Sequence, residues 1–592
     1  MYKRQVITYP NPDEGSVSVL GDFIDGQYEK DTENMNFNSV FNVTIRPIKH
    51  LTYRTNLGYT YNSTKESYFY GSQSFQVNGG VNRAGRENDS DNRITWNNTL
   101  TYDNYFGKHH IVADAIQEII KYQTDDTSAE GRSMDVEDMT YYNLGILTEN
   151  IGIKSSYSGY QLASFMGRIR YSYADKYLFN FSVRSDGSSR LAEGNKWATF
   201  YSAGAAWRVS EEEFLKDIKW LSNLKLRYAY GMVGNQAIDS YVTLGQLDSY
   251  PYQFGSAGTG FYGYRPSSLA NKDLGWEITR THNIGIDFGF FQNKLSGSVE
   301  YYHTTTDDLL MDRAIPVTTG FSMITQNIGK TQNTGVEVSL NANILQRKDF
   351  SFNMFFNFAV NNNKIVDLIN GEDDITNNWF IGHPINVFYN YEKIGIWQLG
   401  EEEEAALYGK RPGDIKMKDQ NPEDGKQITA DADKVILGNK DPKYIASLGG
   451  NLQWKGLDVS FTLNSRWDYL VDASGYGSFV IPTGTRWLAD VDYWTPDNPT
   501  NLYPRPSALW PANVELCGIM KGDYIKLQDL TVGYDFTRLI KKYIPVSRLR
   551  VYAQLRNAFY LYRAARENII PESPGIELTV PRSINFGINL SF

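Results

Sequence analysis

The sequence predicts an all-β protein, a transmembrane antiparallel β-barrel, and three observations point to it. Apolar and polar residues alternate with a period of two along many segments. These segments run for about 10–14 residues, whereas strands of soluble sheets are commonly about 5–6 residues long. Short turns alternate with long connections between them, as in membrane barrels. Tilted strands of about 9–11 residues are long enough to cross a bilayer.

Composition excludes several other classes. The 592 residues include one cysteine, Cys517, so a disulfide framework is excluded. No apolar run is long enough for a membrane helix, which needs about 18 residues. Aromatic residues make up 14% of the chain, too many for a disordered protein. The net charge of −10 argues against a general nucleic-acid binder.

The C-terminal segment shows the alternation clearly. Ile584, Phe586, Ile588 and Leu590 alternate with small or polar residues, and the chain ends on Phe592. A terminal aromatic residue on an unbroken strand is typical of outer-membrane barrels, so we interpret Phe592 as an assembly signal. An ordinary last strand of a soluble sandwich is the alternative. The same alternation recurs in 53–61, 177–183, 201–209, 284–290, 350–360, 457–463 and 549–555.

The connections predict an orientation and a strand count. Short turns fall at 106–108, 292–293, 346–348 and 454–456, and long connections at 64–91, 123–161, 234–277, 308–331, 364–442, 471–522 and 563–580. A capping box beginning at Ser210 predicts a helix on the side of the short turns, and 537–543 predicts a shorter one. Residues 111–122 fit a helix as well as a strand.

From about Asn34 the pattern gives roughly 17 strands. Closed bacterial barrels of this type have an even number of strands, so an odd count predicts a missing N-terminal part. If the complete barrel has 22 strands, about five are missing. The first twenty residues contain no apolar signal-peptide core. We therefore expect residues 1–592 to be one N-terminally truncated barrel domain.

The sequence motifs that could indicate an enzyme lack the surrounding structure that such sites require. Residues 258–263 match G-x-G-x-x-G but lie in a loop, without the strand and helix that a dinucleotide site requires. No H-E-x-x-H spacing occurs. We therefore expect no enzyme, no catalytic residue and no cofactor. An acidic loop with Asp419, Asn421 and Asp424 predicts either a structural calcium site or an Asx-rich turn.

Aromatic residues cluster in two long connections. Their flat faces suit sugars and their polar tips suit hydrogen bonds, although packing between loops or contact with a partner protein would use them equally well. The candidate substrate-binding residues are Tyr250, Tyr252, Phe254, Tyr262, Tyr264, Trp487, Trp494 and Trp510.

Sequence motifs then indicate a family. The chain resembles the SusC/RagA family of TonB-dependent outer-membrane transporters, and the likeness extends over about 224–592. Its motifs stand at 224–231, 275–277, 283–287, 327–329, 333–338, 382–385, 395–397, 412–414, 493–496, 522–527 and 549–552. The acidic loop departs from the family's usual form.

The resemblance implies an importer of oligosaccharides or peptides in the outer membrane of a Gram-negative, Bacteroidetes-type bacterium. It implies a SusD-like lipoprotein as partner and energy from TonB–ExbB–ExbD. The signal peptide, TonB box and plug that precede the barrel in this family are not visible here. A passive outer-membrane porin or adhesin is one alternative, and a soluble β-rich carbohydrate-binding protein is another. The row of Phe352, Met354, Phe356 and Phe358 argues against a soluble protein.

Overall fold

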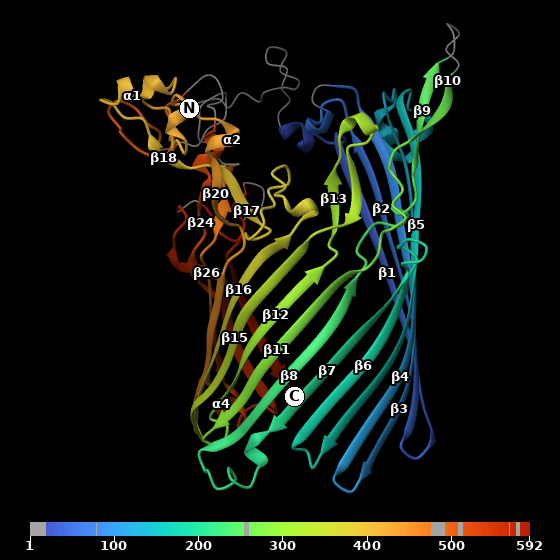
Figure 1. The fold of residues 1–592 in the computed structure, drawn as a ribbon, viewed down its shortest axis with the longest axis vertical. Coiled ribbons are helices and arrows are strands. Elements are labelled where there is room, and N and C mark those ends of the chain that lie inside the picture. Colours follow the sequence, from blue (N-terminus) through green and yellow to red (C-terminus); the bar gives the residue numbers. More distant parts are fainter. Residues whose placement is uncertain are drawn as a thin grey trace.

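The computed structural model describes residues 19–77, 80–253, 260–474, 492–506, 513–566, 569–575 and 580–592. Its main feature is a sheet of 17 antiparallel strands, in which each strand pairs with its neighbour in the chain (Figure 1). Strands β1 and β27 form the two ends of this order. The predicted barrel fold and the count of about 17 strands are therefore confirmed.

The 17 strands are β1 (Tyr28–Ile48), β2 (Leu51–Tyr70), β3 (Arg83–Phe106), β4 (His109–Arg132), β5 (Glu149–Tyr173), β6 (Tyr177–Ser188), β7 (Trp197–Arg208), β8 (Leu221–Asn235), β11 (Glu277–Phe290), β12 (Leu295–Asp307), β15 (Lys330–Arg347), β16 (Phe350–Asp367), β21 (Tyr444–Trp454), β22 (Leu457–Trp467), β25 (Tyr524–Asp535), β26 (Arg548–Arg563) and β27 (Ser583–Ser591). Shorter pairs in the loops are β9 (Leu247–Gln253) with β10 (Gly260–Pro266), β13 (Leu310–Ala314) with β14 (Met323–Asn327), β17 (Val387–Tyr391) with β20 (Lys434–Asn439), β18 (Lys393–Ile396) with β19 (Ile415–Met417), and β23 (Leu470–Asp472) with β24 (Ile519–Lys521). The α-helices α1 (Glu402–Leu407), α2 (Ala430–Asp433) and α4 (Thr537–Ile540) are short.

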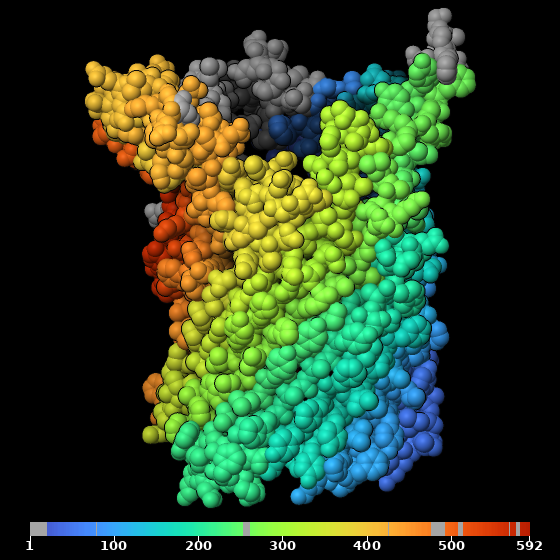
Figure 2. Space-filling view, viewed as in Figure 1, coloured from blue at the N-terminus to red at the C-terminus, as the bar shows by residue number. Residues whose placement is uncertain are grey.

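All four predicted short turns are confirmed, and they lie together at one end of the sheet (Figure 1). We call this the turn end, and the opposite end the loop end. Figure 2 shows that the loop end rises highest at the yellow-orange segment between β16 and β21 and at the green hairpin β9–β10. The chain ends at the turn end, after β27.

The strands near the N-terminus are longer than the sequence pattern predicts. β3 and β4 have 24 residues each and β5 has 25. The predicted connections 64–91 and 123–161 shrink accordingly, because paired strands occupy much of both. Backbone pairing continues past the point where the apolar alternation stops. Residues 111–122, left open between helix and strand, lie within β4.

One helix prediction is wrong. The capping box at Ser210 forms only a 3-10 turn, Val209–Glu211. The next residue, Glu212, instead accepts hydrogen bonds from the Tyr177 hydroxyl at 2.7 Å and the Trp207 indole N–H at 3.1 Å. Contacts to the aromatic rim of the sheet thus replace the helical pattern. The predicted helix in 537–543 is confirmed, over the shorter span of α4.

The two faces of the sheet differ in chemistry. On β5, Phe165 (55% exposed) and Ile169 (53% exposed) point to one face, and Arg168 and Arg170 to the other. Across the ladder, Ala553 pairs with Phe586 and continues the apolar face. An exposed apolar face on strands of this length suits contact with lipid. Among the described residues, none of the helices is both long and apolar enough to cross a membrane.

Ion pairs join neighbouring strands on the polar face. Asp114 on β4 is buried, and it accepts hydrogen bonds from Arg168 Nε at 2.9 Å, Arg170 Nη2 at 3.3 Å and the Thr101 hydroxyl at 2.7 Å. A second group joins Arg227 to Asp287 and Glu300 across three strands. These pairs tie long cationic side chains to carboxylates on neighbouring strands of the wall.

We expect Asp114→Ala to weaken this wall. The substitution removes the shared acceptor of two arginines and one threonine, at a cost of about 1–3 kcal/mol. Far-ultraviolet circular dichroism of the detergent-purified protein should show a lower unfolding temperature. Asp103→Ala is the matched control, because Asp103 is exposed and bonds only to His110 among the side chains described. Equal unfolding temperatures for the two variants would contradict the expectation.

Candidate functional site

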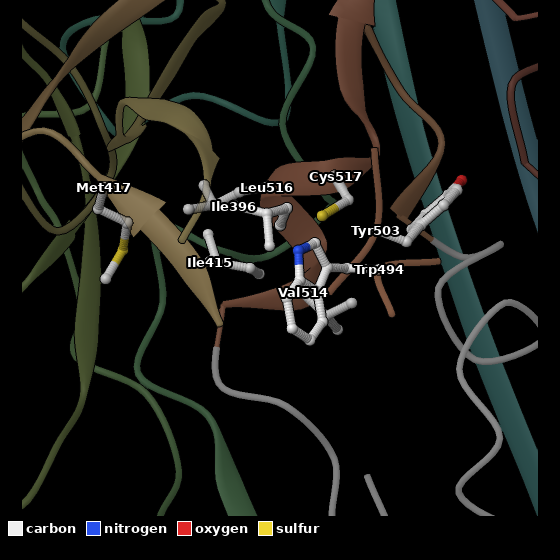
Figure 3. Close-up of a cluster of buried hydrophobic side chains, with 8 residues drawn as sticks. All are labelled: Ile396, Ile415, Met417, Trp494, Tyr503, Val514, Leu516 and Cys517. Carbon is white, nitrogen blue, oxygen red and sulfur yellow. The ribbon is translucent and has the colours of Figure 1, made fainter. Parts of the chain in front are cut away.

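Two long connections fold together at the loop end. One joins β16 to β21 and the other joins β22 to β25. Their buried residues form a single apolar core, which is drawn in Figure 3: Ile396, Ile415 and Met417 come from the first connection, and Trp494, Tyr503, Val514, Leu516 and Cys517 from the second. We call this unit the loop-end layer. Apolar burial thus ties together segments about a hundred residues apart, and the layer has a core of its own beside the sheet.

Polar contacts fix the two connections to each other. The Trp494 indole N–H donates to Gln398 Oε1 at 2.8 Å. Lys393 Nζ donates to the carbonyl of Asn501 at 3.0 Å and to that of Leu502 at 2.7 Å. These bonds join the two connections, and the first of them gives the buried Trp494 N–H the partner that a buried donor requires. The loop-end layer is therefore a folded unit at the loop end of the sheet.

Two titratable groups of this layer are shielded from solvent. Burial raises the pKa of the Cys517 thiol and lowers the pKa of the Lys393 ammonium, so it disfavours the charged form of both groups. The Arg566 guanidinium contacts the Cys517 carbonyl and lies over the Tyr503 ring, 4.5 Å from its centroid. Cys517 is thus a structural core residue with little thiolate at neutral pH.

The hairpin β9–β10 carries four of the predicted aromatic residues and projects from the loop end (Figure 1). Tyr250 and Tyr252 share one face, while Tyr262 and Tyr264 lie on the other. All four rings are largely exposed, with Tyr264 at 72%. Arg265 lies over the Tyr250 ring at 5.0 Å. An arm with aromatic rings on both faces can meet a ligand or a second protein.

The remaining predicted residues fare differently. Trp494 is only 5% exposed and belongs to the core of the loop-end layer, so its ring is not open to a substrate. The prediction that Trp494 binds substrate is therefore wrong. The sequence does not reveal that its ring packs against the other connection. Phe254, Trp487 and Trp510 lie outside the described residues. Phe592 is 89% exposed beyond the end of β27, and its role in assembly stays a prediction.

The acidic loop forms turns around a buried carboxylate. Asp419 accepts hydrogen bonds from the Tyr408 hydroxyl at 3.1 Å and from the backbone N–H of Asn421 at 2.9 Å. Asp433 is fully buried and accepts the backbone N–H groups of Gln420 and Thr429. In the described part of the chain, no three His, Cys, Asp or Glu side chains gather as a metal-binding group. The side chain of Asp424 is outside that part, and calcium binding stays a prediction.

Sequence reasoning missed one group of residues. Asn361 and Asn363 on β16 and Asn333 on β15 line a pocket of about 390 Å³ at the loop end. The signal was present as three consecutive asparagines, residues 361–363, inside a long strand. Asparagine is depleted in strands, so such a run calls for a reason beyond strand formation.

Comparison with known proteins assigns the chain to a family. A family model described as TonB dependent receptor-like, beta-barrel, matches residues 4–558. The chain belongs to the family of TonB-dependent receptors. Members of this family are outer-membrane transport proteins and not enzymes, which agrees with the chemistry that the sequence excludes.

Individual relatives refine this assignment to the SusC/RagA type. The TonB-dependent receptor SusC of Bacteroides thetaiotaomicron is 31% identical over 475 residues, 73% of this chain and 43% of the relative. The TonB-dependent receptor P3 of Formosa agariphila is 29% identical over 565 residues, 92% of this chain and 56% of the relative. The chain thus spans about half the length of the curated relatives it matches.

A solved structure shows the same fold. The structure of the RagAB peptide transporter superposes with a TM-score of 0.82 at 25% identity, covering 96% of this chain and 63% of the other. The resemblance to the SusC/RagA family is therefore confirmed, and so is the barrel fold. In membrane barrels the short turns face the periplasm and the long loops face outward, which is the orientation that we expect for the turn end and the loop end.

We expect Trp494→Ala to open the loop-end layer without unfolding the sheet. Removing a buried indole from a core costs about 3–5 kcal/mol. Cys517 reports on the result, because it is the chain's one cysteine and is buried. The rate of its alkylation by iodoacetamide should rise severalfold in the variant, while the circular dichroism of the sheet stays unchanged. Trp220→Ala, at an exposed ring of the turn end, is the control. Unchanged labelling in Trp494→Ala would contradict the joint core.

Proposed function

We propose that this chain is the barrel of an outer-membrane importer of oligosaccharides or peptides, driven by TonB. The observation that carries the proposal is the pairing of an apolar outer face with a polar, ion-paired inner face on a TonB-dependent receptor sheet. Such a wall suits a water-filled passage for polar solutes. A Bacteroidetes-type outer membrane is the compartment that fits relatives such as SusC.

We infer that further strands complete the barrel. β1 and β27 both run from the loop end to the turn end. Antiparallel closure between two strands of the same direction needs an odd number of strands between them. Unpaired strand edges are not stable in hydrocarbon. A barrel of 22 strands, as in plugged transporters, would supply about five more, together with the plug and the TonB contact.

The loop end is the surface on which we place a SusD-like lipoprotein partner. Two features support this placement: the loop-end layer has a buried apolar core of its own, and the hairpin β9–β10 presents exposed tyrosines on both faces. Tyrosine is enriched at protein interfaces because its ring is apolar and its hydroxyl forms hydrogen bonds. The substrate would enter between these two features.

The import proposal predicts that uptake depends on TonB. Cells that carry the full-length receptor should accumulate labelled peptides or oligosaccharides, and deletion of either the receptor or TonB should abolish accumulation. Immunoblotting of outer membranes should show equal receptor levels with and without TonB. Uptake that persists without TonB would instead indicate a passive pore.

The partner proposal predicts a separate effect of the hairpin. Tyr262→Ser combined with Tyr264→Ser removes the aromatic rings from one face of the arm, and interface rings of this kind can each contribute 2 kcal/mol or more. Recovery of the neighbouring SusD-like lipoprotein with a tagged receptor should fall by about tenfold or more. Tyr105→Ser, at an exposed ring of the turn end, is the control. Equal recovery for the two variants would exclude the hairpin from the interface.

A further inference from the structure

Most of the residues that line a pocket at the loop end are polar, and Pro384, Ile385 and Pro442 add apolar contacts. Its volume is about 390 Å³. The strands contribute Asn333 on β15 and Asn361 and Asn363 on β16, which we call the asparagine triad. The triad lies on the polar face, because Asn353, Asn357 and Asn361 alternate with the apolar row from Phe352 to Phe358 along β16. The pocket is therefore open to the passage and not to lipid.

The hydrogen bonds of the triad have a fixed direction. The backbone N–H of Ile385 can only donate, and it donates to Asn363 Oδ1 at 2.8 Å. The amide nitrogen of Asn363 must then face Asn333, and Asn363 Nδ2 donates to Asn333 Oδ1 at 2.9 Å. Asn361 Nδ2 approaches the same oxygen at 3.4 Å. One backbone donor thus sets the orientation of both Asn363 and Asn333.

This direction leaves an excess of donors. The Tyr302 hydroxyl donates to Asn361 Oδ1 at 2.9 Å, so all three amide oxygens are engaged within the protein. Each carboxamide nitrogen carries two hydrogens. Both hydrogens of Asn333 and one each of Asn361 and Asn363 have no acceptor among the described residues. The triad therefore offers N–H groups to whatever enters the pocket, and it offers few oxygens.

Acceptors reach the same pocket from other segments. Asp441, just before β21, accepts the Asn386 amide at 2.8 Å through one carboxylate oxygen. Asp468, just after β22, also lines the pocket, and its nearest cation, Lys443 Nζ, is 4.0 Å away. Carboxylates with such loose pairing can accept further hydrogen bonds. The pocket thus combines amide donors on two strands with two carboxylate acceptors and the Lys443 ammonium on the adjoining segments.

We propose that this pocket binds the main chain of an extended peptide, with carbonyl groups on the asparagine triad and N–H groups on Asp441 and Asp468. This proposal rests on the proposed import function and assigns its substrate to the peptide class. An extended peptide presents carbonyl and N–H groups along both edges, independent of its side chains. No aromatic ring is among the described residues that line the pocket, so a sugar ring would lack the apolar platform that it favours.

The test replaces the donor without changing its shape. Asn333→Asp keeps an oxygen that accepts from Asn361 and Asn363 and removes both outward N–H groups. The probe is a short, uncharged peptide blocked at both ends, titrated calorimetrically into the full-length receptor in detergent. We expect its affinity to fall by about tenfold or more, because the variant loses two N–H donors to the peptide carbonyl groups. Asn341→Asp is the matched control, because it adds the same charge on the same strand and face outside the pocket.

A second variant tests the acceptor side. Asp441→Asn retains an oxygen for the Asn386 amide while it removes the negative charge, and it should also weaken peptide binding. Peptide affinities equal to the wild-type value in both pocket variants would overturn the proposal. So would a neutral oligosaccharide whose affinity falls in Asn333→Asp while that of the peptide stays unchanged. Either result leaves TonB-dependent import intact, whereas TonB-independent uptake by the wild-type receptor would reject the import function itself.

Discussion

The whole molecule depends on one constraint: a backbone group in hydrocarbon must find its hydrogen-bond partner within the protein. Each internal strand, from β2 through to β26, pairs with two neighbours over all or part of its length. The sheet cannot be shortened, split or flattened in the membrane without exposing unpaired groups. Because the backbone supplies the pairing, the side chains on one face can be apolar toward lipid and those on the other face polar toward water. The alternating sequence provides this arrangement.

The inner wall follows from the same constraint. Since the ladder supplies cohesion, the polar face does not need to be packed, and it carries charged residues that a close-packed core would reject. Those charges are joined across strands, as Asp114 is to Arg168 and Arg170, and Arg227 to Asp287 and Glu300. Joined charges hold their side chains against the wall. The passage is thus lined by polar groups without being filled by them.

Periodicity predicted the strands and turns because the alternation and the ladder have the same period. It underestimated β3, β4 and β5 because backbone pairing continues past the residues at which apolar and polar side chains stop alternating. The capping box at Ser210 predicted a helix that does not form, because the Glu212 carboxylate accepts hydrogen bonds from Tyr177 and Trp207 instead. Trp494 was misassigned because its burial depends on Ile396 and Ile415, far away in the chain. Local pattern carries no information on such contacts.

The change along β16 shows how one strand serves two purposes. Its row of Phe352, Met354, Phe356 and Phe358 suits hydrocarbon, and five residues after Phe358 the opposite face presents Asn363. Outside the hydrocarbon the strand does not need an apolar face. The residues at the loop end of β16 can therefore be suited to binding a substrate. A carboxamide is neutral and can be oriented by a single backbone N–H, as Ile385 orients Asn363. On its side of the pocket, a row of neutral donors can hold carbonyl groups without adding a positive charge that would oppose release, which a transporter needs as much as capture.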